Sequence, residues 1–210
     1  MILIFRNFFN SDLKNLYENF LSLLHLNQHR CPYCNASCSL VKNGHYFRHC
    51  IMFISNTLFD TPFEVQRVKC KECGKTHALL PDCVIPYYSY SYGFIICVLC
   101  EYYLEPSTVE EVCDKFQISP HNLYHWKRIY DKQRVLCALV AQIQANKTNE
   151  SILNYIKAQN PSAFLLCFFN EHRQPFLHDI PTGNSGKGKR YIHHMIYAWY
   201  QEQDHLIMKP

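Results

Sequence analysis

The sequence predicts an α+β fold in which a small antiparallel zinc ribbon is followed by a helical region containing a helix-turn-helix. Three observations predict it. Two CxxC pairs stand thirty-five residues apart, two stretches with strand-like alternation lie between them, and helical periodicity follows. The 210 residues are 48% hydrophobic and 18% charged, which indicates a globular chain and excludes a disordered one.

Hydrophobic spacing predicts the elements in order. An amphipathic helix is expected from Ser11 to about Gln28. Its apolar face is expected to carry Leu13, Leu16, Tyr17, Phe20, Leu23 and Leu24. The expected strands cover 45–53, 63–69 and 78–81, with a further strand-like run over 163–169. The expected helices cover 89–104, 107–116, 119–144 and 191–201.

These elements divide the chain into four segments. The N-terminal helix occupies 1–28, the ribbon 29–86 and the helical region with its helix-turn-helix 87–145. The polar stretch Asn146–Glu150 marks the last boundary, and the sequence assigns no role to 146–210.

The sequence contains twelve cysteines and twelve histidines, several times their common usage. Residues 1–10 lack a basic region and a cleavage site, so no secretory signal is expected. The longest apolar run, 92–100, is about half the length that a membrane helix needs. We therefore expect a cytoplasmic, nucleoid-associated protein with no membrane partner. In a reducing compartment, paired cysteines are typical of metal ligands.

The two CxxC pairs are Cys31–Cys34 and Cys70–Cys73. Each pair supplies two thiolates from one tight turn, and two such turns form a tetrahedral cage that suits one structural Zn²⁺. Asn35 and Gly74 follow the pairs, where positive φ is often required. Because four thiolates leave no position for water, hydrolytic chemistry at this zinc is not expected. Nearby basic residues could offset the thiolate charge: Arg67, Lys69, Lys71 and Lys75.

Other interpretations of the cysteines remain open. All of them could be buried thiols, and Cys97 and Cys100 lie in an apolar helical run where packing is the expected role. The side chains that could replace a ligand are Cys38, Cys50, Cys83, His45, His49 and His77. The single cysteines expected to pack in the core are Cys113, Cys137 and Cys167.

A helix-turn-helix is predicted over 107–130. Ser107 and Glu110 have capping-box spacing, and Ser119 with Pro120 begins the second helix. Gln117 stands where many such turns have glycine, so the turn must tolerate a strained glutamine or follow a different path. The buried face of the second helix is expected to carry Leu123, Trp126 and Ile129 or Tyr130.

The polar side of this second helix is the candidate DNA-binding surface. Between residues 119 and 134, four basic side chains face one acidic one, which suits phosphate contacts. The candidate residues, which form the polar face of this helix, are Ser119, His121, Asn122, Tyr124, His125, Lys127 and Arg128. An ordinary helical hairpin with a solvated face is the alternative.

Several motifs resemble the N-terminal zinc ribbons of bacterial insertion-sequence transposases. They are Cys31-Pro-x-Cys34, Asn43-Gly-His-Tyr-Phe-Arg48 and Arg67-Val-Lys-Cys-Lys-Glu-Cys-Gly-Lys-Thr-His-Ala-Leu-Leu-Pro81. The last of these, with Pro86-Tyr-Tyr-Ser-Tyr-Ser91, is similar to an uncharacterised bacterial family related to the transposases, and 108–129 resembles their helix-turn-helix segments. The resemblance covers about residues 30–130. It implies DNA binding, with the four cysteines as zinc ligands and 119–128 as the reading face.

Catalysis is not expected. Transposases of this kind use three carboxylates on an RNase-H-like sheet, and the residues beyond Asn146 are too few for that sheet. The carboxylates there, Asp179, Glu202 and Asp204, have no strand context, and the GxxxxGK run at 183–189 lacks the Ser or Thr that would hold magnesium. The expected function is therefore zinc-stabilised binding of double-stranded DNA, and the further partners considered are a second copy of the chain or a transposase. The alternative is a zinc-ribbon module for protein interaction that does not bind DNA.

Overall fold

The structure, a computed structural model, describes residues 1–5, 8–9, 12–141, 148–172, 174–178 and 197–199. It confirms the α+β class. Its strands are β1 (Ile2–Ile4), β2 (Leu40–Ile54), β3 (Thr57–Cys70), β4 (Thr76–Pro81) and β5 (Tyr197–Trp199). Its helices are α1 (Leu13–Leu23), the short 3₁₀ helix η1 (Leu26–Gln28), α2 (Tyr92–Leu104), α3 (Val109–Phe116), α4 (Pro120–Val140), α5 (Asn149–Ala158) and α6 (Pro161–His172). None of the helices in these ranges is long and apolar enough to cross a membrane.

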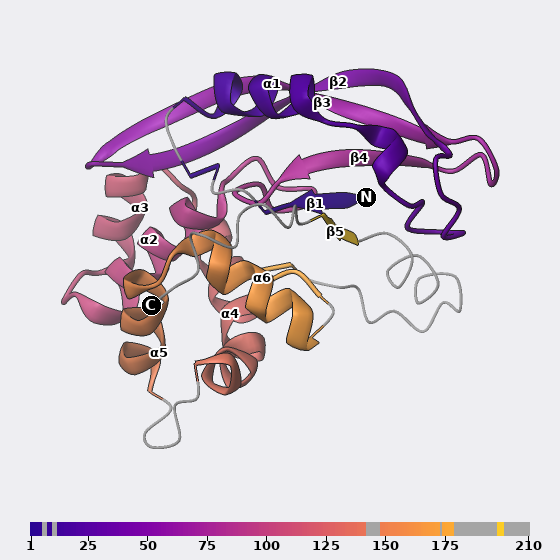
Figure 1. Cartoon of the computed structure of the whole chain (residues 1–210). Helices are drawn as coiled ribbons and strands as arrows, with labels where there is room; N and C mark the ends of the chain where they lie inside the picture. Colours follow the sequence, from indigo (N-terminus) through magenta and orange to yellow (C-terminus); the bar gives the residue numbers. More distant parts are fainter. Residues whose placement is uncertain (6–7, 10–11, 142–147, 173, 179–196, 200–210) are drawn as a thin grey trace.

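A long hairpin of β2 and β3 crosses one side of the molecule (Figure 1). Its closed end is a two-residue loop, Ser55-Asn56, in which both residues have positive φ (50° and 61°). Such a loop matches the twist of the strands it joins, so pairing continues to Ile54 and Thr57 beside it. The strands expected over 45–53 and 63–69 therefore exist and are longer than predicted.

The five strands form one mixed sheet in the order β2-β3-β4-β1-β5. β4 is antiparallel to β3, whereas β1 is parallel to both β4 and β5. The sequence did not predict β1, because a three-residue apolar strand carries no periodicity. The helix expected over 191–201 is wrong at Tyr197–Trp199, which form β5, and the rest of that range lies outside the described residues.

Helices α2–α6 gather below the sheet as it is viewed in Figure 1, and α1 lies along the hairpin. The strand expected over 163–169 is wrong, because these residues lie inside α6. Phe164, Leu165, Phe168 and Phe169 are buried there at helical spacing. A short, continuously apolar run does not by itself distinguish a strand from a buried helix.

Helix α3 begins one residue later than the sequence predicts. Thr108, not Ser107, is the N-cap: its Oγ1 accepts from the Glu111 N–H (3.2 Å), and Glu111 Oε2 accepts from the Thr108 N–H (2.7 Å). Gln117 adopts the left-handed conformation (φ 52°, ψ 46°), so the turn does contain a strained glutamine. Ser119 caps α4 and Pro120 is its first residue, as predicted.

The closed end of the hairpin is docked onto the helices. The Ile51 N–H donates to Ser89 O (2.7 Å) and the Ser91 N–H donates to Ile51 O (2.8 Å). Beyond this bridge the Phe53 ring packs on Phe116 of α3, with ring centroids 4.7 Å apart. The hairpin thus joins its open end, which carries the two CxxC turns, to the α3–α4 pair.

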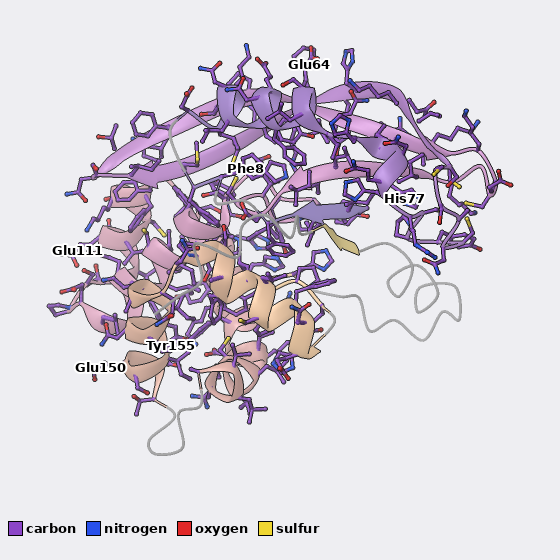
Figure 2. The ribbon with its side chains drawn as sticks, viewed as in Figure 1. Phe8, Glu64, His77, Glu111, Glu150 and Tyr155 are labelled. Atoms are coloured by element: carbon purple, nitrogen blue, oxygen red, sulfur yellow. The ribbon has the colours of Figure 1, made fainter. Side chains whose placement is uncertain are left out.

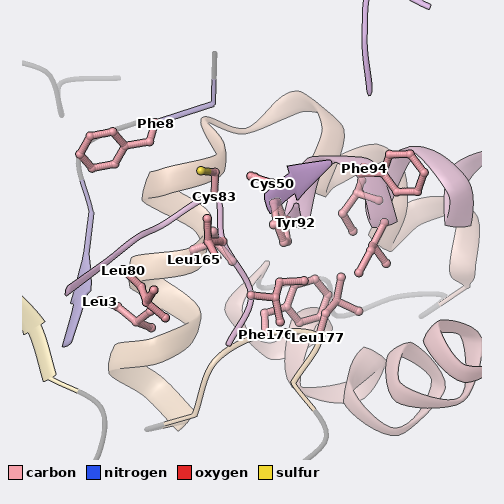
Figure 3. Close-up of a cluster of buried hydrophobic side chains, with 14 of the residues drawn as sticks. Leu3, Phe8, Cys50, Leu80, Cys83, Tyr92, Phe94, Leu165, Phe176 and Leu177 are labelled. Carbon is pink, nitrogen blue, oxygen red and sulfur yellow. The ribbon is translucent and has the colours of Figure 1, made fainter. Parts of the chain in front are cut away.

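The buried side chains form one continuous core that includes residues from all four predicted segments. In Figure 3, Tyr92 of α2 lies among Leu165 of α6, Cys50 of β2 and the aromatic ring of Phe176. At the sheet, the buried Tyr17 hydroxyl of α1 donates to Leu79 O (2.8 Å) and accepts from the Gln66 N–H (3.2 Å). Residues beyond 146 therefore complete the core, a role that the sequence did not indicate.

Candidate metal centre

The four predicted ligands come together at the open end of the hairpin. The sulfur atoms of Cys31, Cys34, Cys70 and Cys73 all lie within 4.8 Å of one another. Cys31 Sγ and Cys73 Sγ are 3.7 Å apart, and Cys34 Sγ and Cys70 Sγ are 3.6 Å apart. Tetrahedral bonds of about 2.3 Å to zinc place sulfurs about 3.8 Å apart, whereas a disulfide requires about 2.05 Å. The cluster thus has the dimensions of a tetrahedral metal site.

Both CxxC turns have the same backbone hydrogen bonds. In the first turn the Cys31 N–H donates to Ala36 O (2.9 Å), and the Asn35 N–H donates back to Cys31 O (2.8 Å). Asn35 has a φ of 60°, as its place after the pair predicted. The turn therefore holds both of its cysteines on one side of a closed backbone loop.

The second turn repeats this pattern thirty-nine residues later. The Cys70 N–H donates to Lys75 O (2.9 Å), and the Gly74 N–H donates to Cys70 O (3.0 Å). Gly74 has a φ of 68°, again as predicted. A Lys71 N–H to Ser39 O bond (2.8 Å) ties this turn to the start of β2. Two equivalent turns are thus held against each other, each contributing two sulfurs.

Ionisation of the sulfurs is unequal. Burial raises the pKa of the Cys31 thiol, and burial raises the pKa of Cys73 to about 12. Burial also opposes ionisation of Cys70, but its hydrogen bonds with backbone N–H groups and with the Ser39 side chain lower its pKa to about 6. Cys70 therefore provides a thiolate near neutral pH, and the remaining protons leave as the metal binds. Since binding releases protons, metal affinity rises with pH and falls in acid.

His77 lies beside the cluster without belonging to it. Its side chain is 4% exposed, and its Nε2 is 3.7 Å from Cys31 Sγ. Figure 2 shows His77 on β4 at the end of the sheet where the cysteines lie. Burial lowers the pKa of His77 to about 4, so the neutral ring has one N–H, which can donate to the sulfur. The sequence offered His77 only as a replacement ligand, and the structure gives it the place of a hydrogen-bond donor.

The other proposed replacements are engaged elsewhere. His45 Nε2 is 3.7 Å from Glu64, and His49 Nδ1 is 2.9 Å from Asp60, both on the exposed face of the hairpin. Cys38 Sγ donates to Asn27 O (3.2 Å). Cys50 and Cys83 are buried in the core. Cys100, Cys113 and Cys137 are buried as predicted, whereas Cys167 is exposed on α6, so its predicted packing role is wrong.

Replacing His77 tests its contact with the cluster. We expect His77→Phe to lower metal affinity by about 10- to 100-fold, because the Cys31 sulfur would lose its N–H donor and ligand orientation would weaken. Competition of zinc with a chromogenic chelator measures the affinity. His49→Phe, a histidine change on the exposed face of the β2–β3 hairpin, should leave the zinc affinity unchanged. Equal zinc affinity in the two variants would show that His77 does not contribute to the metal site.

The seven candidate DNA-binding residues, called the α4 polar face from here on, lie at the end of the hairpin opposite to the cysteine cluster. The fifteen residues of β2 span about 45 Å, so the cluster and this face are far apart. Most of its residues have their side chains in contacts within the protein, and three of these contacts involve Ser119, Asn122 and Lys127. Ser119 Oγ caps α4, Asn122 Nδ2 donates to the Tyr90 hydroxyl (3.4 Å), and Lys127 pairs with Asp131 (3.1 Å).

The other four residues of the face are His121, Tyr124, His125 and Arg128. Arg128 Nη2 lies 3.2 Å from His125 Nδ1, and because a guanidinium can only donate, Nδ1 accepts. His125 Nε2 then carries the proton of the neutral ring and lies 2.7 Å from the Tyr88 hydroxyl. The His121 ring stacks on His125, and Tyr124 is 52% exposed. The sequence did not identify the contribution of Tyr88 and Tyr90, although both lie in the aromatic run before α2.

Fold and site together define an α+β protein with a cluster of four cysteines that could hold a metal ion at one end of a sheet and a capped helix pair at the other. Residues 31–126 match a family described as a domain of unknown function (DUF6431). The matched region begins at the first cysteine of the cluster and ends at Trp126 in α4, so it includes all four cysteines, α3 and the first part of α4. Comparisons with curated proteins and with solved structures give no match.

Proposed function

We propose that this protein binds double-stranded DNA through a helix-turn-helix formed by α3 and α4, on a scaffold closed by one structural Zn²⁺. In this proposal the cysteine turns and the hairpin form a zinc ribbon. The chain is related to the DNA-recognition part of insertion-sequence transposases and has no catalytic activity of its own. Cytoplasmic, nucleoid-associated localisation belongs to the same proposal.

The observation that carries the proposal is the construction of α4. Leu123, Trp126, Ile129 and Tyr130 are each at most 2% exposed and face the core, while His121 and Arg128 are exposed on the other side. α2 packs against both α3 and α4, which gives three mutually packed helices. A helix held by such packing, with polar side chains near its start, is what reading the major groove requires.

The acidic residues of α3 limit how DNA could approach. Glu110, Glu111 and Asp114 are exposed on α3 and would repel phosphates. The exposed cation of α3, Lys115, is paired with Glu101. On α4, Tyr124, Arg128 and Lys132 border a shallow hollow. The proposed contact is therefore made by α4, with α3 turned away from the duplex.

Arg128 provides the direct test. We expect Arg128→Gln to weaken duplex binding by about 8-fold at 0.1 M salt and to reduce the slope of log K against log [salt] by about 0.9, as loss of one phosphate contact would. If Arg128 instead contacts a base edge, the loss is about 1–3 kcal/mol on the selected sequence only. Fluorescence anisotropy on duplexes selected from a random-sequence pool measures both.

Lys157→Gln on α5 is the matched control, since it removes one exposed positive charge far from α4 in sequence. It should bind DNA as the unaltered chain does. Salt-independent binding, or no duplex binding near physiological salt, would contradict the proposal.

Exposed apolar side chains favour the second candidate, a protein-interaction module with a second copy or a transposase as partner. Phe47 is 72% exposed, Leu23 67% and Leu139 57%. Scattered exposed side chains are common on monomers, so they support this function less strongly than the packing of α4 supports DNA binding. The same titration separates the two candidates, because an interaction module would bind no duplex.

A further inference from the structure

The metal end of the molecule carries an excess of positive charge. Residues 29–45 and 66–77, which hold the cysteine turns and the strand ends beside them, contain six Lys or Arg and one acidic residue, Glu72. We name these six the basic patch: Arg30, Lys42, Arg67, Lys69, Lys71 and Lys75. Even after the formal charge of about −2 of a zinc tetrathiolate, the region stays positive. Residues 107–134, with the α3–α4 pair, are closer to balance, with five basic and four acidic residues.

The basic patch is exposed, and its charged groups form no ion pairs with the described carboxylates. All six residues are exposed to solvent. Among the described residues, the ion pairs involve other cations: Lys115 with Glu101, Lys127 with Asp131, and two histidines of the hairpin. Within the patch, Lys75 lies over the Tyr33 ring, 5.3 Å from its centroid. No described carboxylate therefore forms an ion pair with a residue of this patch.

Two of its members are held in a regular array. On β3, Arg67 and Lys69 alternate with the buried Val68 and Cys70, so both project from the outer face of the sheet. Residues two apart on one face are separated by about 6.6 Å, which is similar to the spacing of successive phosphates on one DNA strand. Lys71 continues the row into the second cysteine turn. The metal fixes the end of this row by holding Cys70 and Cys73.

We propose that the basic patch is a second surface for the phosphate backbone of double-stranded DNA, separate from the α4 polar face. This inference rests on the proposed DNA-binding function and extends it. Lysine is depleted at protein interfaces, which argues against a protein partner here. Polyanion binding through lysine and arginine needs only exposed and unpaired charge, which this surface has. The patch then adds affinity without sequence preference.

A double charge neutralisation tests the patch on the full, zinc-loaded chain. Arg67→Gln/Lys69→Gln removes two positive charges from the outer face of β3 without touching a cysteine. If both contact phosphates, the salt slope falls by about 1.8 and affinity at 0.1 M salt falls by up to about 60-fold, equally on selected and random duplexes. Lys14→Gln/Lys157→Gln, an equal charge change on α1 and α5, is the matched control and should keep the original slope. Zinc content should be one per chain in both.

The outcomes separate this inference from the proposed function. If the patch variant binds like the control while Arg128→Gln is weakened, the patch proposal is overturned and the α4 proposal stands. If the patch variant is weakened while Arg128→Gln is not, the patch stands and the α4 proposal fails. Absence of duplex binding by the unaltered chain, including the case where it binds only single-stranded RNA or an acidic protein, overturns both.

Discussion

A Cys70→Ser protein is expected to lose its zinc and much of its stability. Cys70 is fully buried, its sulfur is 3.6 Å from Cys34 Sγ, and it is also the last residue of β3. Residues 29–39 contain turns and isolated bridges only, so a metal held by the four cysteines would be the principal link between them and the sheet. Structural zinc contributes about 10–16 kcal/mol in small zinc domains, which is comparable with the whole stability of a typical protein.

We do not expect Cys70→Ser to lose all of this stabilisation, because the helical core remains. We expect a loss of at least about 5 kcal/mol, which lowers the melting temperature of a chain of this size by about 10–20 °C. Calorimetry together with metal analysis measures both quantities. Cys38→Ser is the matched control: Cys38 is exposed, lies four residues after Cys34 and stands outside the cluster. A Cys70→Ser chain that keeps its zinc and melts like this control would contradict the role of Cys70.

Trp126→Ala is expected to have the next largest effect. Trp126 is 1% exposed and its ring meets Tyr90 and Phe94, with centroids 4.9 and 6.0 Å away. Truncating a buried tryptophan leaves a cavity and costs about 3–5 kcal/mol. Because Tyr90 belongs to the segment that bridges to β2, the loss should also loosen α4 from the hairpin. Duplex binding should fall while zinc content stays at one per chain.

Urea unfolding measures this loss directly. Tyr124→Ala, two residues away on the same helix and half exposed, should change the free energy of unfolding by no more than about 0.5 kcal/mol. Similar stability of the two variants would mean that α4 is not held by the packing described here. Loss of zinc in Trp126→Ala would instead show that helices and metal centre unfold as one unit.

The cysteine cluster and the α3–α4 pair could be predicted because their determinants are local. Asn35 and Gly74 sit directly after the ligand pairs, and Ser119-Pro120 starts a helix through its own side chain and ring. At α3 the capping box was predicted one residue too early, because Thr108 and not Ser107 forms it. Ser107 Oγ donates to Glu101 Oε1 instead (3.1 Å), a contact that depends on the position of α2.

The central sheet and the C-terminal helices could not be predicted because they depend on distant contacts. β1 is a strand because Ile2–Ile4 pair with Leu79–Pro81, more than seventy residues later. The run 163–169 is helical because α6 buries Phe164 and Phe168 against Phe176 and packs on α4 and α5. The Tyr88–His125 contact likewise joins two segments thirty-seven residues apart. The spacing of residues along the sequence does not indicate these pairings.

X-ray absorption spectroscopy at the zinc edge, with metal analysis of the purified chain, tests the central claim most directly. The account predicts one zinc per chain with four sulfur neighbours at about 2.3 Å and no nitrogen or oxygen in the coordination sphere. A chain purified under reducing conditions that binds no zinc, or zinc bound by fewer than four sulfurs, would contradict it.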